Sequence, residues 1–174
     1  GKELEQKKVM CQECVSQLNN RKSGTSLRDY TPEDLQYLLG KVEETKRRVC
    51  MHVVEENQRV IDARRAFIKK DMATYGKLLN RSHESLRDNY EISCPEVDWL
   101  VKRALELDGV LGARLFGKGF AGGAISLLKN EALNPYYERL AEYEHIFGFE
   151  PETFLFEATV GAKVIHKSRR RIRA

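Results

Sequence analysis

The segment from Gly109 to Lys129, GVLGARLFGKGFAGGAISLLK, constrains the fold of this chain more than any other stretch. β-Branched and apolar residues predict a strand at 110–116, and a second apolar run predicts another strand at 124–128. A dense group of glycines separates the two runs and marks the turn between them. The sequence therefore predicts a strand, a glycine-rich loop and a second strand.

The loop between these strands also carries a positive charge at Lys118. Its glycines fall within seven residues and are Gly117, Gly119, Gly122 and Gly123. A backbone of this kind can adopt positive φ, and aligned N–H groups then make a concave anion site. Two interpretations stay open: a phosphate-binding loop, or a hairpin with a wide turn. The spacing matches neither GxxxxGK[ST] nor a GxGxxG motif that opens a helix.

Length and composition are those of an ordinary globular protein. With 174 residues, 32% charged and 41% hydrophobic, the chain can bury the core of one domain. It contains neither an apolar run near the ~20 residues that a membrane span needs nor a secretory signal. We therefore expect a cytoplasmic protein with no membrane partner.

The net charge of +4 is concentrated in the last nine residues, HKSRRRIRA. The rest of the chain is then close to neutral, which argues against nucleic acid as a partner. We expect a domain at 1–166 followed by a basic, disordered tail at 167–174. That tail is either a solubilising terminus or a salt-sensitive contact for nucleic acid or an acidic partner, and the nucleic-acid hypothesis rests on it alone.

The four cysteines are Cys11, Cys14, Cys50 and Cys94. Cys11 and Cys14 form a CxxC motif, but the second pair that a structural zinc site needs is missing, so we expect no metal site. Without a signal peptide, reduced thiols are the default. Cys11 and Cys14 are interpreted as small apolar residues on a buried helical face.

Periodicity and capping residues predict six helices. Start signals stand at Thr31-Pro32, at Asp71 and at Ser93-Cys94-Pro95-Glu96, which has the pattern of a capping box. Stop signals stand at Gly40 and Gly148. The predicted helices cover residues 4–19, 31–39, 41–69, 72–88, 95–107 and 134–147.

A β-rich segment at 153–165 completes the predicted order of helices, strand pair, helix and final strand or hairpin. This order indicates an α+β fold, with helices packed on one face of a small antiparallel sheet. Three strands make a thin platform for so many helices. We therefore expect a further strand before residue 1.

Several polar residues have a structural and a functional interpretation. In the helix at 41–69, Val49, Val53 and Val60 share an apolar stripe, and Glu55-Glu56 is most simply part of the solvated face. Arg87-Asp88 is either a surface ion pair or a support of an active-site rim. The histidines show no triad or HExxH spacing and are interpreted as surface or packing residues: His52, His83, His145 and His166.

Five runs of the sequence resemble the C-terminal half of galactokinases, which belong to the GHMP superfamily of small-molecule kinases. The longest and most specific is SHESLRDNYEISCPEVDWLV at 82–101, followed by GVLGARLFGKGFAGG. HVVEENQRV at 52–60, TFLFEATVGAKV at 153–164 and KKVMCQECVSQL are also similar to that family. The resemblance covers nearly the whole chain and implies the C-terminal domain fold of GHMP kinases.

In that family the glycine loop is the third signature motif, GxRxTGGGFGGC. It lies beside the active site and supports the phosphate-binding loop of the second motif. By position, this sequence matches the motif at Arg114, Gly117, Gly119, Phe120 and Gly122. The resemblance thus implies a loop next to phosphate and substrate, made of Arg114, Gly117, Lys118, Gly119, Phe120, Gly122 and Gly123.

Four positions depart from the motif. Phe116 stands where the family has Thr, Lys118 and Ala121 replace glycines, and Gly123 replaces Cys. Phe116 removes a hydroxyl and adds bulk, and Ala121 costs about 1 kcal/mol if its φ is positive. Lys118 can bind a phosphate or an acidic sugar group, or point to solvent.

The resemblance implies an ATP-dependent kinase that phosphorylates the anomeric hydroxyl of galactose or a related sugar, with ATP and Mg²⁺ as cofactors. The family's N-terminal sugar motif, its PxGxGLSSS-type loop and its catalytic Asp are absent from this sequence. We therefore expect no catalytic residue here, an N-terminal domain of the same protein as partner, and an inert segment when isolated. The alternative is a degraded kinase-like module that senses a sugar or nucleotide, or binds a protein.

Overall fold

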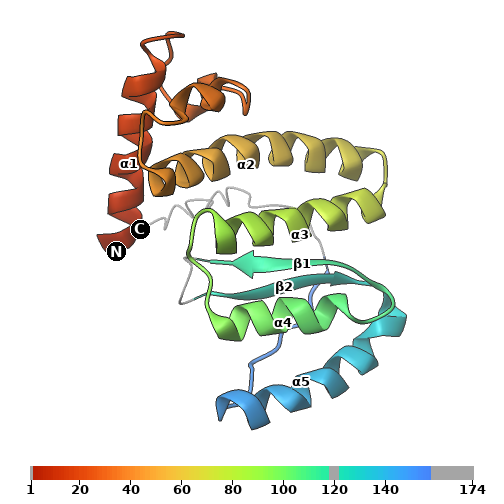
Figure 1. Ribbon diagram of the computed structural model, residues 1–174. Helices are drawn as coiled ribbons and strands as arrows, with labels where there is room; N and C mark the ends of the chain where they lie inside the picture. Colours follow the sequence, from red (N-terminus) through yellow and green to blue (C-terminus); the bar gives the residue numbers. More distant parts are fainter. Residues whose placement is uncertain (1, 118–121, 158–174) are drawn as a thin grey trace, which may run out of the picture.

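The elements follow one another as helices, a two-stranded hairpin and a last helix (Figure 1). The computed structural model describes residues 2–117 and 122–157. The α+β class is confirmed, and so are both hairpin strands and all the predicted helices except 31–39. The elements are α1 (Lys2–Leu18), η1 (Leu27–Asp29), η2 (Asp34–Leu38), α2 (Glu44–Ile68), α3 (Met72–Asp88), α4 (Pro95–Leu105), β1 (Val110–Phe116), β2 (Gly123–Leu128), η3 (Asn130–Ala132) and α5 (Leu133–Phe147).

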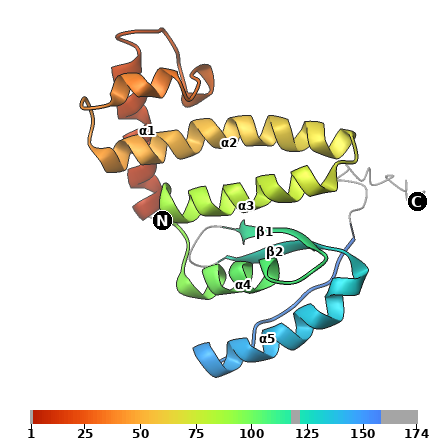
Figure 2. The same cartoon turned by 45° about the vertical axis from the view of Figure 1, so that its right-hand side comes forward.

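β1 and β2 pair antiparallel, and α3 runs along the free edge of β1 (Figures 1 and 2). Asn80 Oδ1 of α3 accepts a hydrogen bond from the backbone N–H of Ala113 at 2.8 Å. His83 Nδ1 of α3 accepts one from the backbone N–H of Leu115 at 3.3 Å. Because these side chains satisfy backbone donors on an edge strand, α3 both protects β1 and fixes its position.

Helix and strand approach this closely because glycine stands on both sides of the contact. A Cβ added at Gly76 would lie 2.0 Å from the carbonyl oxygen of Leu111. One added at Gly112 would lie 2.3 Å from the carbonyl oxygen of Gly76. Neither position has room for a side chain, so these two glycines set the distance between α3 and the hairpin.

The two faces of β1 have different surroundings, as the alternation of side chains along a strand requires. Ala113 and Leu115 are fully buried, whereas Arg114 is half-buried and Phe116 is exposed. Arg114 and Phe116 therefore point away from the core beneath the hairpin. We call this core the hairpin core; its buried residues are Leu86, Ile92, Val97, Val101, Ala104, Ala113 and Leu115.

A second, separate core lies where α1, η1 and η2 meet the first half of α2. It contains no charged side chain, and Leu35 and Leu38 are completely buried in it. We call it the N-terminal core; its buried residues are Cys14, Leu18, Leu27, Tyr30, Leu35, Leu38, Cys50 and Val54. The burial of Cys14 confirms its predicted place on an inward helical face, while Cys11 is half-buried.

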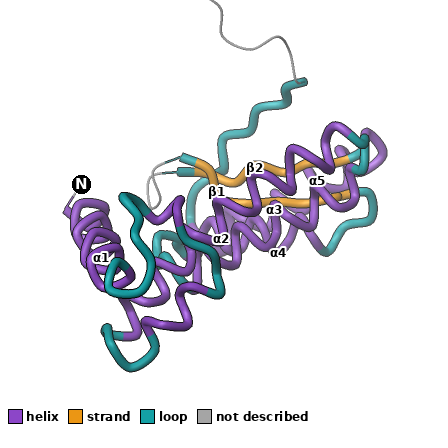
Figure 3. Tube along the Cα trace, turned by 90° about the horizontal axis from the view of Figure 1, so that it is seen from above, coloured by secondary structure: helices purple, strands orange, loops and turns teal. Residues whose placement is uncertain are grey.

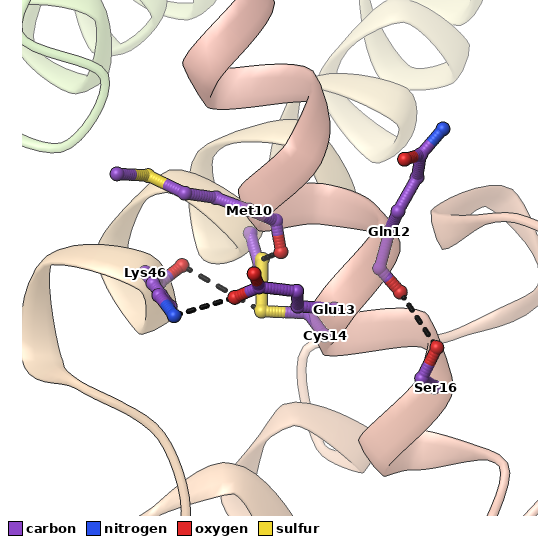
Figure 4. The surroundings of a disulfide bond; sticks show 7 residues. Met10, Gln12, Glu13, Cys14, Ser16 and Lys46 are labelled. Carbon is purple, nitrogen blue, oxygen red and sulfur yellow. Dashed lines mark hydrogen bonds and ion pairs between the residues drawn. A yellow bond between two sulfur atoms is a disulfide. The ribbon is translucent and has the colours of Figure 1, made fainter.

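Cys14 of α1 and Cys50 of α2 form a disulfide inside the N-terminal core (Figure 4). Glu13 and Lys46 make an ion pair between the same two helices. The prediction of reduced thiols is therefore wrong for this pair, whereas Cys11 and Cys94 are free. The two bonded residues are 36 positions apart on different helices, a pairing that the CxxC spacing did not indicate.

α2 reaches from the N-terminal core to the far end of α3; it lies alongside α3, and α1 crosses its first half (Figures 1 and 3). Its first half is buried at Val49, Cys50 and Val54. Its last two turns carry apolar side chains that are largely exposed within the described structure, 67% at Val60 and 58% at Phe67. The apolar stripe predicted for this helix is thus buried only along its first half.

Two helix starts differ from the predictions. Residues 31–39 form a turn and the short 3-10 helix η2, in which Thr31 Oγ1 accepts from the backbone N–H of Asp34 at 3.3 Å. At α4 the N-cap is Cys94 and Pro95 is the first helical residue, while the Ser93 hydroxyl donates to Asp98. The predicted capping box at 93–96 is therefore wrong, because Cys94 and not Ser93 is the N-cap, whereas Pro95 is the first helical residue as predicted.

The predicted strand at 153–165 lies only partly in the described residues. Residues 153–157 form neither helix nor strand, and the remainder lies outside the described part of the chain, as does the tail at 167–174. The further strand expected before residue 1 and the domain limits at 1–166 stay predictions. In the residues that the structure describes, no helix combines the length and the apolar character of a membrane span.

Candidate functional site at the glycine hairpin

Three of the predicted loop residues, Gly117, Gly122 and Gly123, lie at the turn of the hairpin. Gly117 has φ +90°, a left-handed conformation in which a side chain is strained. A Cβ on Gly117 would lie 3.2 Å from Cα of Gly122, so the two sides of the turn are in close contact. The predicted need for glycine is confirmed at this position. Lys118, Gly119, Phe120 and Ala121 lie outside the described residues, so their predicted roles stay predictions.

Two departures from the third motif are explained by a single contact. Phe116 and Gly123 are direct partners across the hairpin. A Cβ on Gly123 would lie 2.9 Å from Cε1 of the Phe116 ring, closer than side-chain atoms pack. The glycine at 123 therefore makes room for the ring at 116. Compared with the Thr and Cys of the motif, the larger side chain stands on β1 and the smaller one on β2.

Arg114 stands three residues before Gly117, on the face of β1 opposite the hairpin core. Its Nε donates to the carbonyl oxygen of Leu115 at 2.9 Å. Its Nη1 lies 3.9 Å from Oε2 of Glu56 on α2, and its side chain remains 30% exposed. The guanidinium is thus anchored at one end to its own strand and directed towards α2.

The facing sides of α2 and α3 are joined by polar side chains, which we call the polar seam: His52, Glu56, Arg59, Ser82 and Ser85. His52 Nδ1 lies 2.9 Å from Oγ of Ser85, and the Ser82 hydroxyl donates to Glu56 Oε2 at 2.8 Å. Arg59 Nε donates to Glu56 Oε1. Because His52, Glu56 and Arg59 lie one turn apart on α2, they form a continuous row along the α2–α3 contact.

The prediction that Glu56 belongs to a solvated face is wrong. Its side chain is only 21% exposed and accepts hydrogen bonds from Arg59 of α2 and Ser82 of α3. A signal was present in the sequence, because Glu56 follows Val49 by seven residues and precedes Val60 by four. A charged residue thus interrupts the predicted apolar stripe. The neighbouring Glu55 is 34% exposed and contacts Arg59 at 3.3 Å.

Burial and hydrogen bonding set the charges in the polar seam. Burial lowers the pKa of His52 to about 4, so its ring is neutral near pH 7. Burial raises the pKa of Glu56, but the hydrogen bonds from Arg59 and Ser82 outweigh it and hold that pKa below its ordinary value. The seam therefore presents a neutral imidazole and an ionised carboxylate to Arg114.

His83, interpreted from sequence as a surface or packing residue, is buried beside β1. Burial lowers its pKa, which suits a ring whose Nδ1 must stay unprotonated to accept from Leu115. Its Nε2 lies 3.3 Å from Oδ1 of Asp98 without hydrogen-bond geometry. His83 is thus a structural residue that holds the edge of the hairpin.

A groove of about 430 Å³ runs between α2 and α3 and ends at Arg114. Its polar end is formed by Glu56, Arg59, Ser82 and Arg114. Its other end is apolar and includes Phe67 and Tyr75, whose ring centroids are 6.0 Å apart. Arg114 is therefore shared by the hairpin, the polar seam and the groove.

One other expectation has a clear outcome. Arg87 and Asp88 form an ion pair at 2.7 Å with both side chains well exposed. Of the two interpretations given above, the structure therefore supports the surface ion pair. Among the residues that the structure describes, no three carboxylate, imidazole or thiol groups lie close enough together to hold a metal ion.

Comparison with known proteins places this site in a family. Residues 63–143 match the family described as "GHMP kinases C terminal", a range that contains α3, α4, the hairpin and most of α5. The chain therefore carries a domain of the GHMP kinase C-terminal family.

Its relatives within that family are galactokinases. The chain is 40% identical over 164 residues to the galactokinase of Thermotoga petrophila, and 36% identical over 158 residues to that of Clostridium acetobutylicum. These matches cover 94% and 90% of this chain, but only 45% and 41% of the relatives. The chain thus spans less than half the length of the curated relatives it matches.

A solved structure agrees with these matches. The galactokinase of Lactococcus lactis, crystallised in complex with galactose, superposes with a TM-score of 0.79 at 30% sequence identity. The match covers 86% of this chain and 39% of that protein. The GHMP kinase C-terminal fold implied by the sequence is confirmed.

Proposed function

We propose that this chain is the C-terminal part of an ATP-dependent sugar kinase of the galactokinase type. The complete protein would transfer the γ-phosphoryl group of ATP to the anomeric hydroxyl of galactose or a related sugar, with release of ADP and the hydroxyl proton. The observation that carries the proposal is the match to galactokinases over nearly the whole chain. ATP as a substrate also makes the cytoplasm its place of action.

In this proposal the hairpin forms one wall of the active site. The loop from Gly117 to Gly123, with Lys118, Gly119 and Phe120, would bring backbone N–H groups close to a phosphate. Arg114 would add a guanidinium, which binds phosphate oxygens through paired hydrogen bonds. The support for this role is the exposure of Phe116 and Gly117 and the place of Arg114 in the lining of the groove.

The remaining parts of the site would come from the missing N-terminal domain, which is the partner of this chain within one protein. Mg²⁺ is held by few carboxylates together with substrate phosphates. In this proposal its protein ligands belong to the N-terminal domain, as the resemblance to galactokinases implies. The 174-residue chain alone is expected to be catalytically inert. The alternative role as a degraded sensing module has no support in the relatives.

The test is an assay of the longer protein that contains this chain. The purified protein is incubated with ATP, Mg²⁺ and a panel of hexoses and hexuronic acids, and products are resolved by chromatography. A sugar 1-phosphate formed together with ADP is the expected result. The proposal is lost if the folded protein phosphorylates none of the sugars.

A further inference from the structure

Glu56 occupies the point where α2, α3 and β1 meet. Its carboxylate accepts hydrogen bonds from Ser82 of α3, at 2.8 Å, and from Arg59 one turn further along α2. Nη1 of Arg114, from β1, lies 3.9 Å from the same oxygen that Ser82 binds. Groups from three separate elements thus converge on one carboxylate.

A carboxylate at this place is not what packing alone would select. Its position continues the row of the buried Val49, seven residues earlier on α2. A buried charge is costly unless it is paired, and a whole buried ion pair can often be replaced by apolar side chains without loss of stability. The partners of Glu56 therefore indicate a role beyond holding α2 against α3.

The partner nearest to the candidate active site is Arg114. Nε donates to the Leu115 carbonyl oxygen, and the Glu56 carboxylate lies 3.9 Å from Nη1 at the far end of the guanidinium. Among the described residues, neither Nη atom donates a hydrogen bond to a protein group, and the side chain opens onto the groove. The guanidinium is held in one orientation while its outer donors stay available to an anion.

We propose that Glu56 is a positioning residue that acts through Arg114. The carboxylate orients the guanidinium at the base of the glycine loop, so that it meets a phosphate oxygen of the reacting nucleotide without first reorganising. Preorganised charge of this kind lowers the barrier of phosphoryl transfer more than it strengthens ground-state binding. The inference rests on the proposed kinase function, because the anion is the phosphate of that reaction.

The test uses the longer protein with four forms: wild type, Glu56→Gln, Arg114→Gln and the double variant. Glutamine keeps the length of Glu56 and can still accept from Ser82, so the substitution removes the charge that faces both Arg59 and Arg114, and the Arg114→Gln background isolates the part that acts through Arg114. Glu55→Gln is the matched control, because Glu55 is the adjacent carboxylate and contacts Arg59 but neither Ser82 nor Arg114.

Steady-state kinetics then separate positioning from structural support. We expect Glu56→Gln to lower kcat about tenfold, with KM for sugar and ATP changed less than about twofold. Glu55→Gln should retain the wild-type kcat. In the Arg114→Gln background, Glu56→Gln should cause no further loss, since its effect passes through the missing guanidinium. Losses that multiply in the double variant, or a Glu56→Gln enzyme equal to the control, would overturn the proposal.

Hydrogen exchange supplies a readout that does not depend on turnover. Peptides covering 110–128 should exchange faster in Glu56→Gln and in Arg114→Gln, and no faster in the double variant. If the wild-type protein phosphorylates no sugar, the proposed function fails, and this exchange pattern alone decides whether Glu56 holds Arg114. Additive exchange in the double variant would contradict that contact as well.

Discussion

The two long sides of α2 form contacts of opposite character. Towards α1 it packs the apolar N-terminal core, closed by the disulfide between Cys14 and Cys50. Towards α3 it presents the polar seam, in which Glu56 accepts hydrogen bonds from Ser82 and Arg59. One helix thus holds its neighbours by burial on one side and by directed hydrogen bonds on the other.

The difference indicates which contact stabilises the fold and which one fixes the positions of polar atoms. Apolar burial is non-directional and contributes roughly 25 cal/mol per Å², so it stabilises without fixing any polar atom. Hydrogen bonds between half-buried groups add about 1 kcal/mol each but fix distances and angles. We therefore expect the N-terminal core to contribute most of the free energy that holds α2 in place. We expect the polar seam to orient the side chains of the candidate site.

The largest expected effect comes from the disulfide. It closes a loop between residues 36 apart, and such a crosslink contributes about 4 kcal/mol through the entropy of the unfolded chain. Reduction with a dithiol should lower the free energy of unfolding by that amount, measured by urea denaturation. The Cys11→Ser/Cys94→Ser variant, which keeps the pair, should respond to reductant in the same way. An unfolding curve insensitive to reductant would contradict the disulfide.

The next effect is in the N-terminal core. Leu38→Ala removes a side chain that is 0% exposed and should cost about 3 kcal/mol of unfolding free energy, since the cavity cannot fully collapse. Leu39→Ala is the matched control, because that neighbouring leucine is 54% exposed and should cost well under 1 kcal/mol. Equal costs for the two variants would mean that the core is not packed as described.

A smaller effect, visible only in acid, is expected from His52 of the polar seam. Its pKa of about 4 in the folded chain lies below the ordinary 6.5, so below pH 6.5 the unfolded chain binds more protons. Stability should therefore fall as pH drops through 6.5, by about 2 kcal/mol at pH 5 and by about 3 kcal/mol once it levels off below pH 4. Glu56 on the next turn favours the charged ring, while Arg59 and Arg114 oppose it.

Chemical denaturation at several pH values measures this loss. His52→Gln should show a flatter dependence than wild type between pH 6.5 and 4, because the titrating ring is gone while glutamine can still bond Ser85. His145→Gln, at an exposed position on α5, controls for the loss of a histidine. Parallel pH profiles for His52→Gln and wild type would show that His52 is not buried in the seam.

The smallest effect concerns the hairpin that the polar seam supports. Gly123→Cys restores the family residue but places a Cβ 2.9 Å from the Phe116 ring, so we expect a cost of about 1 kcal/mol. In a Phe116→Thr background the same change should be neutral or stabilising, because the space is then free and glycine weakens a strand. Thermal unfolding of the four forms gives the coupling. Additive effects of the two substitutions would contradict the proposed contact between the side chains at positions 116 and 123.

Much of the fold followed from local signals in the sequence. Asp71 caps α3 by accepting from the backbone N–H of Thr74, and Gly148 ends α5 in a left-handed conformation, both as predicted. The strands were predictable because the glycines that separate them interrupt two apolar runs. Signals of this kind act within a few residues and need no knowledge of the tertiary structure.

The rest depended on contacts between distant residues. Cys14 and Cys50 meet only because α1 packs on α2, and sequence spacing does not determine such a pairing. Glu56 was assigned to solvent because local charge density suggested it, although its position in the apolar stripe indicated burial. Of the candidate site, the structure places Gly117, Gly122 and Gly123 at the turn of the hairpin, while their role at a phosphate stays a prediction. It adds the polar seam, which the sequence did not predict.

The most direct test of the account measures unfolding free energy and kcat together for Glu56→Gln and Leu38→Ala in the longer protein. We predict opposite patterns: Glu56→Gln loses about tenfold in kcat and no more than about 1.5 kcal/mol of stability, whereas Leu38→Ala loses about 3 kcal/mol with kcat per folded molecule unchanged. If kcat of Glu56→Gln falls only in proportion to the unfolded fraction, the polar seam is a structural contact and the account is wrong.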